Sequence, residues 1–228
     1  MTKEGLIRLL SSRGSGNHAD LREAIELADT RLRGRNRCSG EPAVEHSYEV
    51  AAMLLQICQC DEIVIAGVLH DLPEDTGLLI SAIGERFGPT VAFLVDGLTH
   101  EPDFGESDWE EQSFWYCFKL WYYARADPRI LLIKLFDRLH YFRTRRAMSK
   151  NSRQRHAQET IDVLLPMAGW ICGSMYGGLE PVRSWVEELQ RLAGDDYQDE
   201  SGSLAAFFSR PELKTISRMP RLGKAGDG

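Results

Sequence analysis

The sequence predicts an all-α protein, and three observations lead to this class. Apolar residues recur three and four positions apart along most of the chain, as at Leu21, Ala24, Ile25 and Ala28. Aspartate, proline and glycine stand where these segments would begin or end, which is typical of helix boundaries. No stretch shows the alternation of a half-buried β-strand, and the sequence has no internal repeat.

Composition narrows the class of protein further. The 228 residues are 43% hydrophobic and 27% charged, which is typical of a soluble globular domain. A formal net charge of -7 argues against nucleic-acid binding through bulk charge. No apolar run approaches the roughly 18 residues of a membrane span, and the N-terminus is unlike a signal peptide. Five cysteines without a C-x-x-C pair indicate reduced thiols, so we expect a cytoplasmic protein.

The N-terminal half is predicted to be helical apart from its first residues and one loop. We expect a short apolar turn within residues 1–18, a flexible link over Ser11–Gly16 and a loop over Gly34–Pro42. Asp61 is expected to cap the helix that ends at His70-Asp71. Apolar periodicity predicts further helices over Asp20–Arg33, Glu45–Ile57, Leu78–Phe87 and Thr90–Leu98.

The C-terminal half begins with a long aromatic helix, predicted over Trp109–Ala126. Core packing and partner contact account for its aromatic residues better than base stacking does. Asp127-Pro128 is expected to start the next helix, because proline suits a first turn. We assign residues 1–193 to one domain and 194–228 to a partly disordered C-terminal appendage. Two further helices are expected over residues 152–172 and Glu180–Leu192.

Polar residues that can bind a metal follow the most apolar helix. The segment Ile63–Leu69 runs directly into His70-Asp71, and Glu74 and Asp75 follow within four residues. Unpaired buried charge is costly, so this cluster at the end of a packed helix favours a metal site. Pro73 argues against one continuous helix, and the two acids are therefore expected to begin a new turn.

Three separate segments together offer two imidazoles and two carboxylates. Such a set suits a divalent ion of borderline hardness, such as Mn²⁺, Fe²⁺ or Zn²⁺. Taken alone, His46 would be assigned to the surface or the core, and Asp137 to a surface pair with Arg138. Taken together with the His-Asp pair, they favour a metal centre. The candidate ligands are His46, His70, Asp71 and Asp137, and the histidines not expected to contribute are His18, His100, His140 and His156.

The order His…His-Asp…Asp resembles the signature of the HD phosphohydrolase superfamily. Longer segments within residues 20–172 are similar to the RelA/SpoT-type alarmone hydrolases; they lie in Arg37–His46, Leu69–Thr76, Phe87-Gly88, Arg129–Thr144 and Ala157–Ala168. The resemblance implies an HD-domain helical bundle. The chain has no room for the nucleotide-synthesising domain of the long members, so we expect a stand-alone small alarmone hydrolase.

The resemblance also implies a reaction and its residues. In that family one Mn²⁺ is held by two histidines and two aspartates, which match the four candidate ligands. The family removes pyrophosphate from the 3′ position of guanosine tetra- or pentaphosphate (ppGpp or pppGpp), giving GDP or GTP. The ion is expected to polarise the phosphoryl group and lower the pKa of water. Glu74 and Asp75 match the acids that position and deprotonate that water.

Substrate contacts follow from the same resemblance. Arg37 matches an arginine that packs against the nucleobase, and Ser39 lies close enough to assist. Lys119 is expected to meet a phosphate, and Thr144 matches a substrate-contacting threonine. Tyr141 stands where relatives carry an asparagine that faces the nucleotide, so the nucleotide pocket is expected to be altered.

Two other functions remain as alternatives. The altered pocket leaves open another nucleotide substrate, such as an adenine analogue (ppApp-like), a nicotinamide nucleotide with a ribose phosphate (NADPH) or a 5′-nucleotide. A non-enzymatic role, as the partner of an alarmone-synthetase toxin, is motivated by the aromatic helix and the charged tail. Trp121, Tyr122 and Trp185 are candidates for a homo-oligomer interface.

Overall fold

The computed structural model describes residues 1–13, 18–58, 60–100, 109–169 and 182–198, and it confirms the all-α class. Within these residues the only β feature is an isolated bridge between Asn36 and Pro42. The chain forms two compact units, one made of Met1–His100 with Leu132–Met148, the other of Glu101–Leu131 with Ser149–Gly228. No helix in the described ranges combines the length and the apolar character that a membrane crossing needs.

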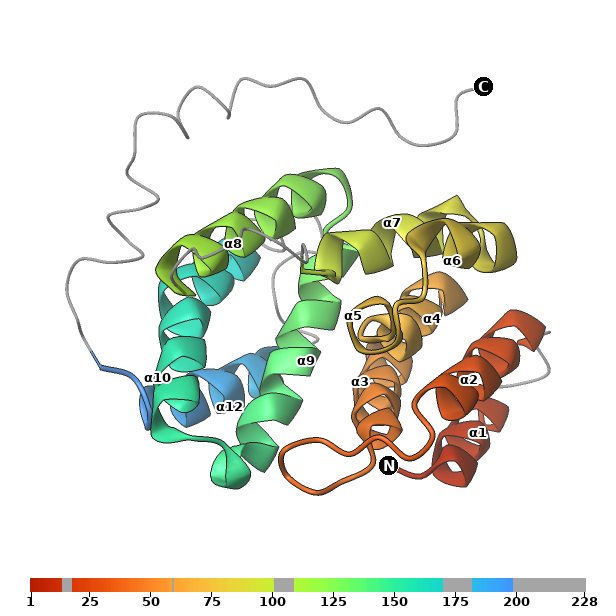
Figure 1. Cartoon of the computed structure of the whole chain (residues 1–228), viewed down its shortest axis with the longest axis horizontal. Coiled ribbons are helices and arrows are strands. Elements are labelled where there is room, and N and C mark those ends of the chain that lie inside the picture. The colour runs from red at the N-terminus through yellow and green to blue at the C-terminus, as the bar shows by residue number, and fades with distance from the viewer. Residues whose placement is uncertain (14–17, 59, 101–108, 170–181, 199–228) are drawn as a thin grey trace. The chain divides into compact units, whose positions relative to one another are not determined.

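The first unit holds most of the helices (Figure 1). Helix α9 (Arg129–Thr144) contributes its residues from Leu132 onward to this unit, followed by the short 3-10 helix η1 (Arg145–Ala147). The remaining helices of the unit are α1 (Lys3–Ser11), α2 (Ala19–Arg31), α3 (Ala43–Ile57), α4 (Asp61–Leu69), α5 (Leu72–Thr76), α6 (Ile80–Phe87) and α7 (Pro89–Leu98).

Helix α4 forms the centre of the first unit. Every residue from Ile63 to Leu69 is buried, as expected for a helix that is apolar all round. It packs against α2, α3 and α7. Gly67 permits the close approach of α3, because a Cβ atom there would lie 2.5 Å from Cδ1 of Leu54. The polar His70-Asp71 pair follows directly at the C-terminal end of this buried helix.

Two predictions for the N-terminal region were wrong. The expected short turn is the nine-residue helix α1, capped by Thr2, and its Leu6 and Leu10 are fully buried. Asp61 does not cap α4, because the N-cap position belongs to Cys60. The Asp61 carboxylate instead lies 2.6 Å from Nδ1 of His18, so it joins the start of α2 to the start of α4.

The helix is interrupted after α4, as the proline predicted. Helix α5 begins at Leu72 with Pro73 in its first turn, where proline's missing N–H group costs nothing. Gly77 ends α5 with a φ angle of 67°, a left-handed conformation that side chains other than glycine adopt at a cost. Helix α6 begins two residues later than predicted and α7 one residue earlier, while both end where predicted.

The second unit contains α8 (Trp109–Ala126), α10 (Lys150–Glu159), the π-helical turn η2 (Thr160–Leu164) and α12 (Arg183–Gly194). The aromatic helix α8 has the predicted bounds. Phe114 and Tyr116 are buried, whereas Trp115 is 39% exposed. Ser113 Oγ donates a hydrogen bond of 2.5 Å to Glu159, which ties α8 to α10. The aromatic residues are therefore partly core, as predicted.

Several predicted segments lie wholly or partly outside the described residues. These are residues 14–16 of the predicted flexible link, residues 170–172 and 180–181 of two predicted helices, and residues 199–228 of the predicted appendage. The division into a domain of residues 1–193 and an appendage therefore stays a prediction.

Candidate metal centre

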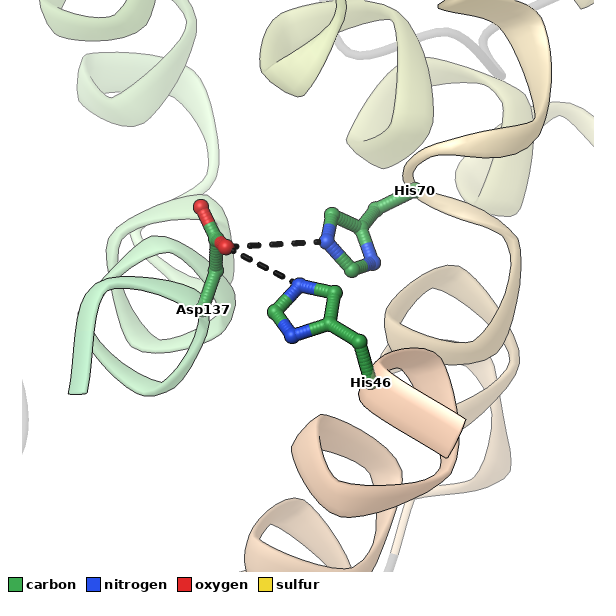
Figure 2. Close-up of side chains that lie close together, drawn as sticks. All are labelled: His46, His70 and Asp137. Atoms are coloured by element: carbon green, nitrogen blue, oxygen red, sulfur yellow. Dashed lines mark ion pairs between the residues drawn. The ribbon is translucent and has the colours of Figure 1, made fainter. Parts of the chain in front are cut away.

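Three helices bring two imidazoles and a carboxylate together in the first unit. His46 lies in the first turn of α3, His70 is the C-cap of α4, and Asp137 lies in the middle of α9. One nitrogen of each histidine and one oxygen of Asp137 all lie within 4.8 Å of one another. Figure 2 shows all three side chains pointing to a common centre. The structure thus brings together three of the four predicted ligands.

The fourth predicted ligand, Asp71, borders the same centre. Its Oδ1 lies 3.1 Å from Nε2 of His70, and its Oδ2 lies 3.5 Å from Nε2 of His46. Asp137 Oδ1 lies 3.1 Å from Nε2 of His46 and 3.9 Å from Nε2 of His70. Both imidazole Nε2 atoms therefore face carboxylate oxygens from two different helices.

The Nε2 atoms of His46 and His70 are buried, and neither has a hydrogen-bond partner among the described residues. Buried polar atoms are usually paired, so two orphaned nitrogens at one place need an explanation. A divalent cation explains them, because it would bind both nitrogen lone pairs and the neighbouring carboxylate oxygens at once. The donor set of imidazoles and carboxylates fits such an ion.

His46, His70 and Asp137 each contact a further group through the atom that faces away from the centre. Nδ1 of His70 donates to the backbone oxygen of Gly67 at 2.9 Å. Nδ1 of His46 lies 2.8 Å from Nδ1 of His140, and Lys134 Nζ donates to Oδ2 of Asp137 at 2.7 Å. Second contacts of this kind fix the orientation of metal ligands.

His140 was not predicted to be a ligand and lies outside the ligand group, but it contacts the site through His46. His140 is only 8% exposed, and its ring contacts that of His46 at a centroid distance of 4.8 Å. Lys134 was also missed as a site residue. Both stand three positions from Asp137 on α9, a spacing that places them on the same helix face. That spacing is the signal in the sequence by which they could have been found.

Burial and charge shift the pKa values of these groups. Burial lowers the pKa of His46, and it lowers the pKa of His140 to about 3 with help from the His46 charge. Burial alone would raise the pKa of Asp137, but Lys134 and His46 outweigh it and hold that pKa well below its usual value. The pKa of Asp71 is also lowered, because His70 and His46 outweigh the effect of burial. The two carboxylates are thus held ionised and His46 is held toward the neutral form, which are the states that bind a metal.

The predicted catalytic acids, Glu74 and Asp75, lie on α5 immediately beyond the centre. Glu74 Oε1 accepts hydrogen bonds from the backbone N–H and from Nδ1 of His100, at 2.8 and 2.9 Å. Burial alone would raise the pKa of Glu74, but these bonds lower it. The pKa of Asp75 is raised, by burial first and then by the charges of Asp71 and Glu74. The two neighbouring acids therefore have pKa values shifted in opposite directions.

A closed loop carries Arg37 to the edge of the centre. Arg37 N donates to the backbone oxygen of Glu41 at 2.8 Å, and Gly40 N donates back to the oxygen of Arg37 at 2.8 Å. Nη1 of Arg37 lies 3.8 Å from Oδ2 of Asp71. Ser39 Oγ in the same loop is buried and lacks a hydrogen-bond partner within the described ranges. Both predicted contacts of this loop thus have polar groups available for a ligand.

The other predicted substrate contacts are placed less favourably. The Thr144 hydroxyl donates to the backbone oxygen of His140 at 3.0 Å, and Tyr141 is only 6% exposed, with its ring edge-on to Phe142. Lys119 belongs to α8 in the second unit, where its Nζ lies 5.7 Å from the centre of the Tyr123 ring. The asparagine-to-tyrosine change predicted from the sequence thus falls on a largely buried side chain.

The chain is similar to known proteins over most of its length. The family model described as an HD domain matches residues 24–170. A protein named GTP pyrophosphokinase rsh from Brucella melitensis is 37% identical over 174 residues, which are 76% of this chain and 22% of that protein. A probable GTP pyrophosphokinase from Mycobacterium leprae is 36% identical over 152 residues, 67% of this chain and 19% of that protein. The chain spans about a fifth of the length of these curated relatives.

A solved structure has a similar fold. It is described as a metazoan ortholog of SpoT that hydrolyses ppGpp and plays a role in starvation responses. The TM-score is 0.57 with 21% sequence identity, and the match covers 79% of this chain and 99% of that one. At this identity the likeness establishes the fold.

Proposed function

Because the chain belongs to the HD-domain family, we propose that it is a metal-dependent phosphohydrolase that removes pyrophosphate from the 3′ position of ppGpp or pppGpp. One observation carries the proposal. Two buried imidazole nitrogens without hydrogen-bond partners in the described chain face two carboxylates, directly beside a pair of acids. That arrangement suits a cation and a water molecule together.

In this proposal His46, His70, Asp71 and Asp137 hold one divalent cation, which we take to be Mn²⁺. When bound, such a cation supplies Lewis-acid polarisation of the phosphoryl oxygens. The ligand chemistry also accommodates Fe²⁺ or Zn²⁺. Lys134 and His140 would keep the ligand atoms aimed at the ion, since they contact Asp137 and His46 from behind.

The two acids on α5 have different roles toward the attacking water. Glu74, whose pKa is lowered, stays ionised and accepts a hydrogen bond that orients the attacking water. Asp75, whose pKa is raised, is the better group to take up the proton of that water. The oxygen of the water adds to the phosphorus that carries the 3′ oxygen. The bond between that phosphorus and the 3′ oxygen breaks, and the 3′ oxygen takes up a proton as it leaves. The products are pyrophosphate and GDP or GTP.

The nucleotide is proposed to lie against the loop that carries Arg37. A guanidinium plane suits the face of a purine. The Ser39 hydroxyl has no hydrogen-bond partner within the described part of the chain, and it suits a polar group of the base or ribose. Thr144 is retained as a proposed substrate contact, Lys119 as a proposed phosphate contact, and Tyr141 as a residue that shapes the pocket. The solved relative described as hydrolysing ppGpp supports this choice of nucleotide, as do the relatives named GTP pyrophosphokinases.

The test is pyrophosphate release from ppGpp by purified protein with Mn²⁺, with the ion removed by chelator, and with the ion restored. Asp71→Asn is expected to lower kcat at least 100-fold, because a ligand of the ion loses its charge. Asp20→Asn is the matched control, since Asp20 is exposed on α2, and it should retain full activity. Turnover that persists in chelator, or an active Asp71→Asn protein, would refute the proposal.

A second candidate is the same chemistry on another nucleotide, which the tyrosine at position 141 favours. A panel of guanine and adenine 3′-pyrophosphorylated nucleotides, NADPH and 5′-nucleotides, assayed for phosphate and pyrophosphate, separates the two. Faster turnover of adenine or nicotinamide compounds, or products without pyrophosphate, would support the second candidate. Loss of that selectivity in Tyr141→Asn would assign it to this side chain.

A further inference from the structure

We propose that His140 is a positioning residue that fixes which ring nitrogen of His46 carries the proton. Its Nδ1 accepts a hydrogen bond from Nδ1 of His46, which leaves Nε2 of His46 bare for a divalent cation. This inference rests on the metal site of the proposed function, but it concerns binding of the ion and not turnover.

The contact between the two rings leaves only two arrangements. The Nδ1 atoms of His46 and His140 lie 2.8 Å apart, and the two residues are only 1% and 8% exposed. At this distance one nitrogen must carry the shared proton and the other must accept it, because two protons would collide and two lone pairs would repel. Water cannot easily relieve a mismatch at so buried a contact.

The groups that face Nε2 of His46 decide which of the two Nδ1 atoms carries the shared proton. Its Nε2 lies 3.1 Å from Oδ1 of Asp137 and 3.5 Å from Oδ2 of Asp71. An ion bound between these groups needs the Nε2 lone pair, so the single proton of neutral His46 must be on Nδ1. His140 must then accept at Nδ1 and carry its own proton on Nε2. The tautomer of one ring therefore fixes the tautomer of the other.

His70 reaches the same state through a different partner. Its Nδ1 lies 2.9 Å from the backbone oxygen of Gly67, which can only accept a hydrogen bond. In the neutral ring, which binding of an ion requires, its Nε2 is therefore bare. The two histidines present the same nitrogen to the centre, one held by a backbone carbonyl and the other by a side chain. Only the second support can be removed by substitution, which makes His140 the position to test.

Helix α9 supplies this support together with a ligand. His140 follows Asp137 by three residues, so both project from neighbouring turns of one helix face. A single helix thus provides the carboxylate of the site and the group that orients an imidazole from α3. An acceptor at position 140 is what the arrangement requires, and a full imidazole is not.

Two substitutions test this requirement. His140→Leu keeps an apolar volume but offers no acceptor, whereas the Oδ1 atom of asparagine in His140→Asn can accept in place of Nδ1. His18→Leu is the control, because it also removes a histidine with a hydrogen bond to its Nδ1, in this case from a pair with Asp61. Mn²⁺ and Zn²⁺ affinities are measured by competition with a coloured chelator, without substrate.

The Leu variant is expected to bind both ions about 10- to 100-fold more weakly, as loss of an orienting contact does elsewhere. The Asn variant should recover most of the affinity, and the His18 control should match the parent protein. Long-range ¹⁵N–¹H spectra of the Zn²⁺-loaded parent protein should show His46 protonated at Nδ1 and His140 at Nε2. Should the Leu variant fail to fold, the Asn variant and these spectra still decide.

Parent-like affinity of the Leu variant, or a bare Nδ1 on His46 in the Zn²⁺-loaded protein, would overturn the inference. So would a parent protein that binds no divalent cation. A protein that binds the ion with the expected protonation but releases no pyrophosphate from ppGpp would refute the proposed function and leave this inference intact.

Discussion

Replacing Lys134 by methionine tests the buried ion pair on α9. Its ammonium group lies 2.7 Å from Oδ2 of Asp137, and the side chains keep only 10% and 14% of their exposure. At that separation the attraction is about 6 kcal/mol for an effective dielectric constant of about 20, and desolvation of both charges offsets much of it. Breaking a buried pair by removing one partner costs about 3–5 kcal/mol. With some exposure remaining, we expect about 3 kcal/mol for Lys134→Met.

The assay is urea unfolding of the metal-free protein at neutral pH, followed by circular dichroism. The double variant Lys134→Met/Asp137→Asn has neither charge, so it should lose about 2 kcal/mol less than the sum of the two single variants. Lys150→Met, at an exposed lysine of α10, should change stability by less than about 0.5 kcal/mol. If the costs of the single variants simply add, the ion pair does not contribute and the reasoning is wrong.

The coupling should also depend on pH. Lys134 and His46 hold the pKa of Asp137 well below its usual value despite burial. A carboxyl group whose pKa is lower in the folded protein contributes stability above its unfolded pKa, about 3.9. It loses that contribution as the pH falls through the folded pKa. The measured coupling should therefore be constant from neutral pH down to about pH 5, and it should decline only below about pH 4.

Three further outcomes follow from the first unit. Gly67→Ala places a Cβ atom 2.5 Å from Cδ1 of Leu54 in a packed core, so urea unfolding should show a loss of about 1–3 kcal/mol; unchanged stability would mean that α3 and α4 are packed less closely. Gly77→Ala forces a side chain into a φ angle of 67° and should cost about 1 kcal/mol, whereas a gain would exclude that conformation. His100→Ala removes the side-chain hydrogen bond, one of the two that lower the pKa of Glu74, so the pKa of Glu74 measured by NMR of its carboxyl carbon should rise; an unchanged pKa would refute this role of His100.

Features that depend on neighbouring residues alone were predictable from the sequence. The break at Pro73 follows from a missing N–H group, and the bounds of the aromatic helix follow from its uninterrupted pattern. His70 and Asp71 could be proposed as ligands because they directly follow the apolar segment Ile63–Leu69, and His46 and Asp137 because they complete a donor set for a divalent ion. Their convergence needed the fold, since His46 and Asp137 lie far apart in the sequence.

Features set by packing between helices were not predictable. Helix α1 is too short to be stable alone, and it forms where it packs against α2 and α3, with Leu6 and Leu10 buried. His140 was set aside because its partner is contributed by another helix. The π-helical turn Thr160–Leu164 has no signal in the residues that form it, and we have no physical account of it.

The break after α4 also bears on how many ions the site holds. On a continuous helix, Glu74 would share a face with His70, and Asp75 would share one with Asp71. Four adjoining oxygen and nitrogen donors on one surface would invite a second cation. Because α4 ends at Leu69 and α5 begins at Leu72 with a proline in its first turn, the two pairs do not share one continuous helix. One proline thereby disfavours the continuous four-donor surface on which a second cation would bind.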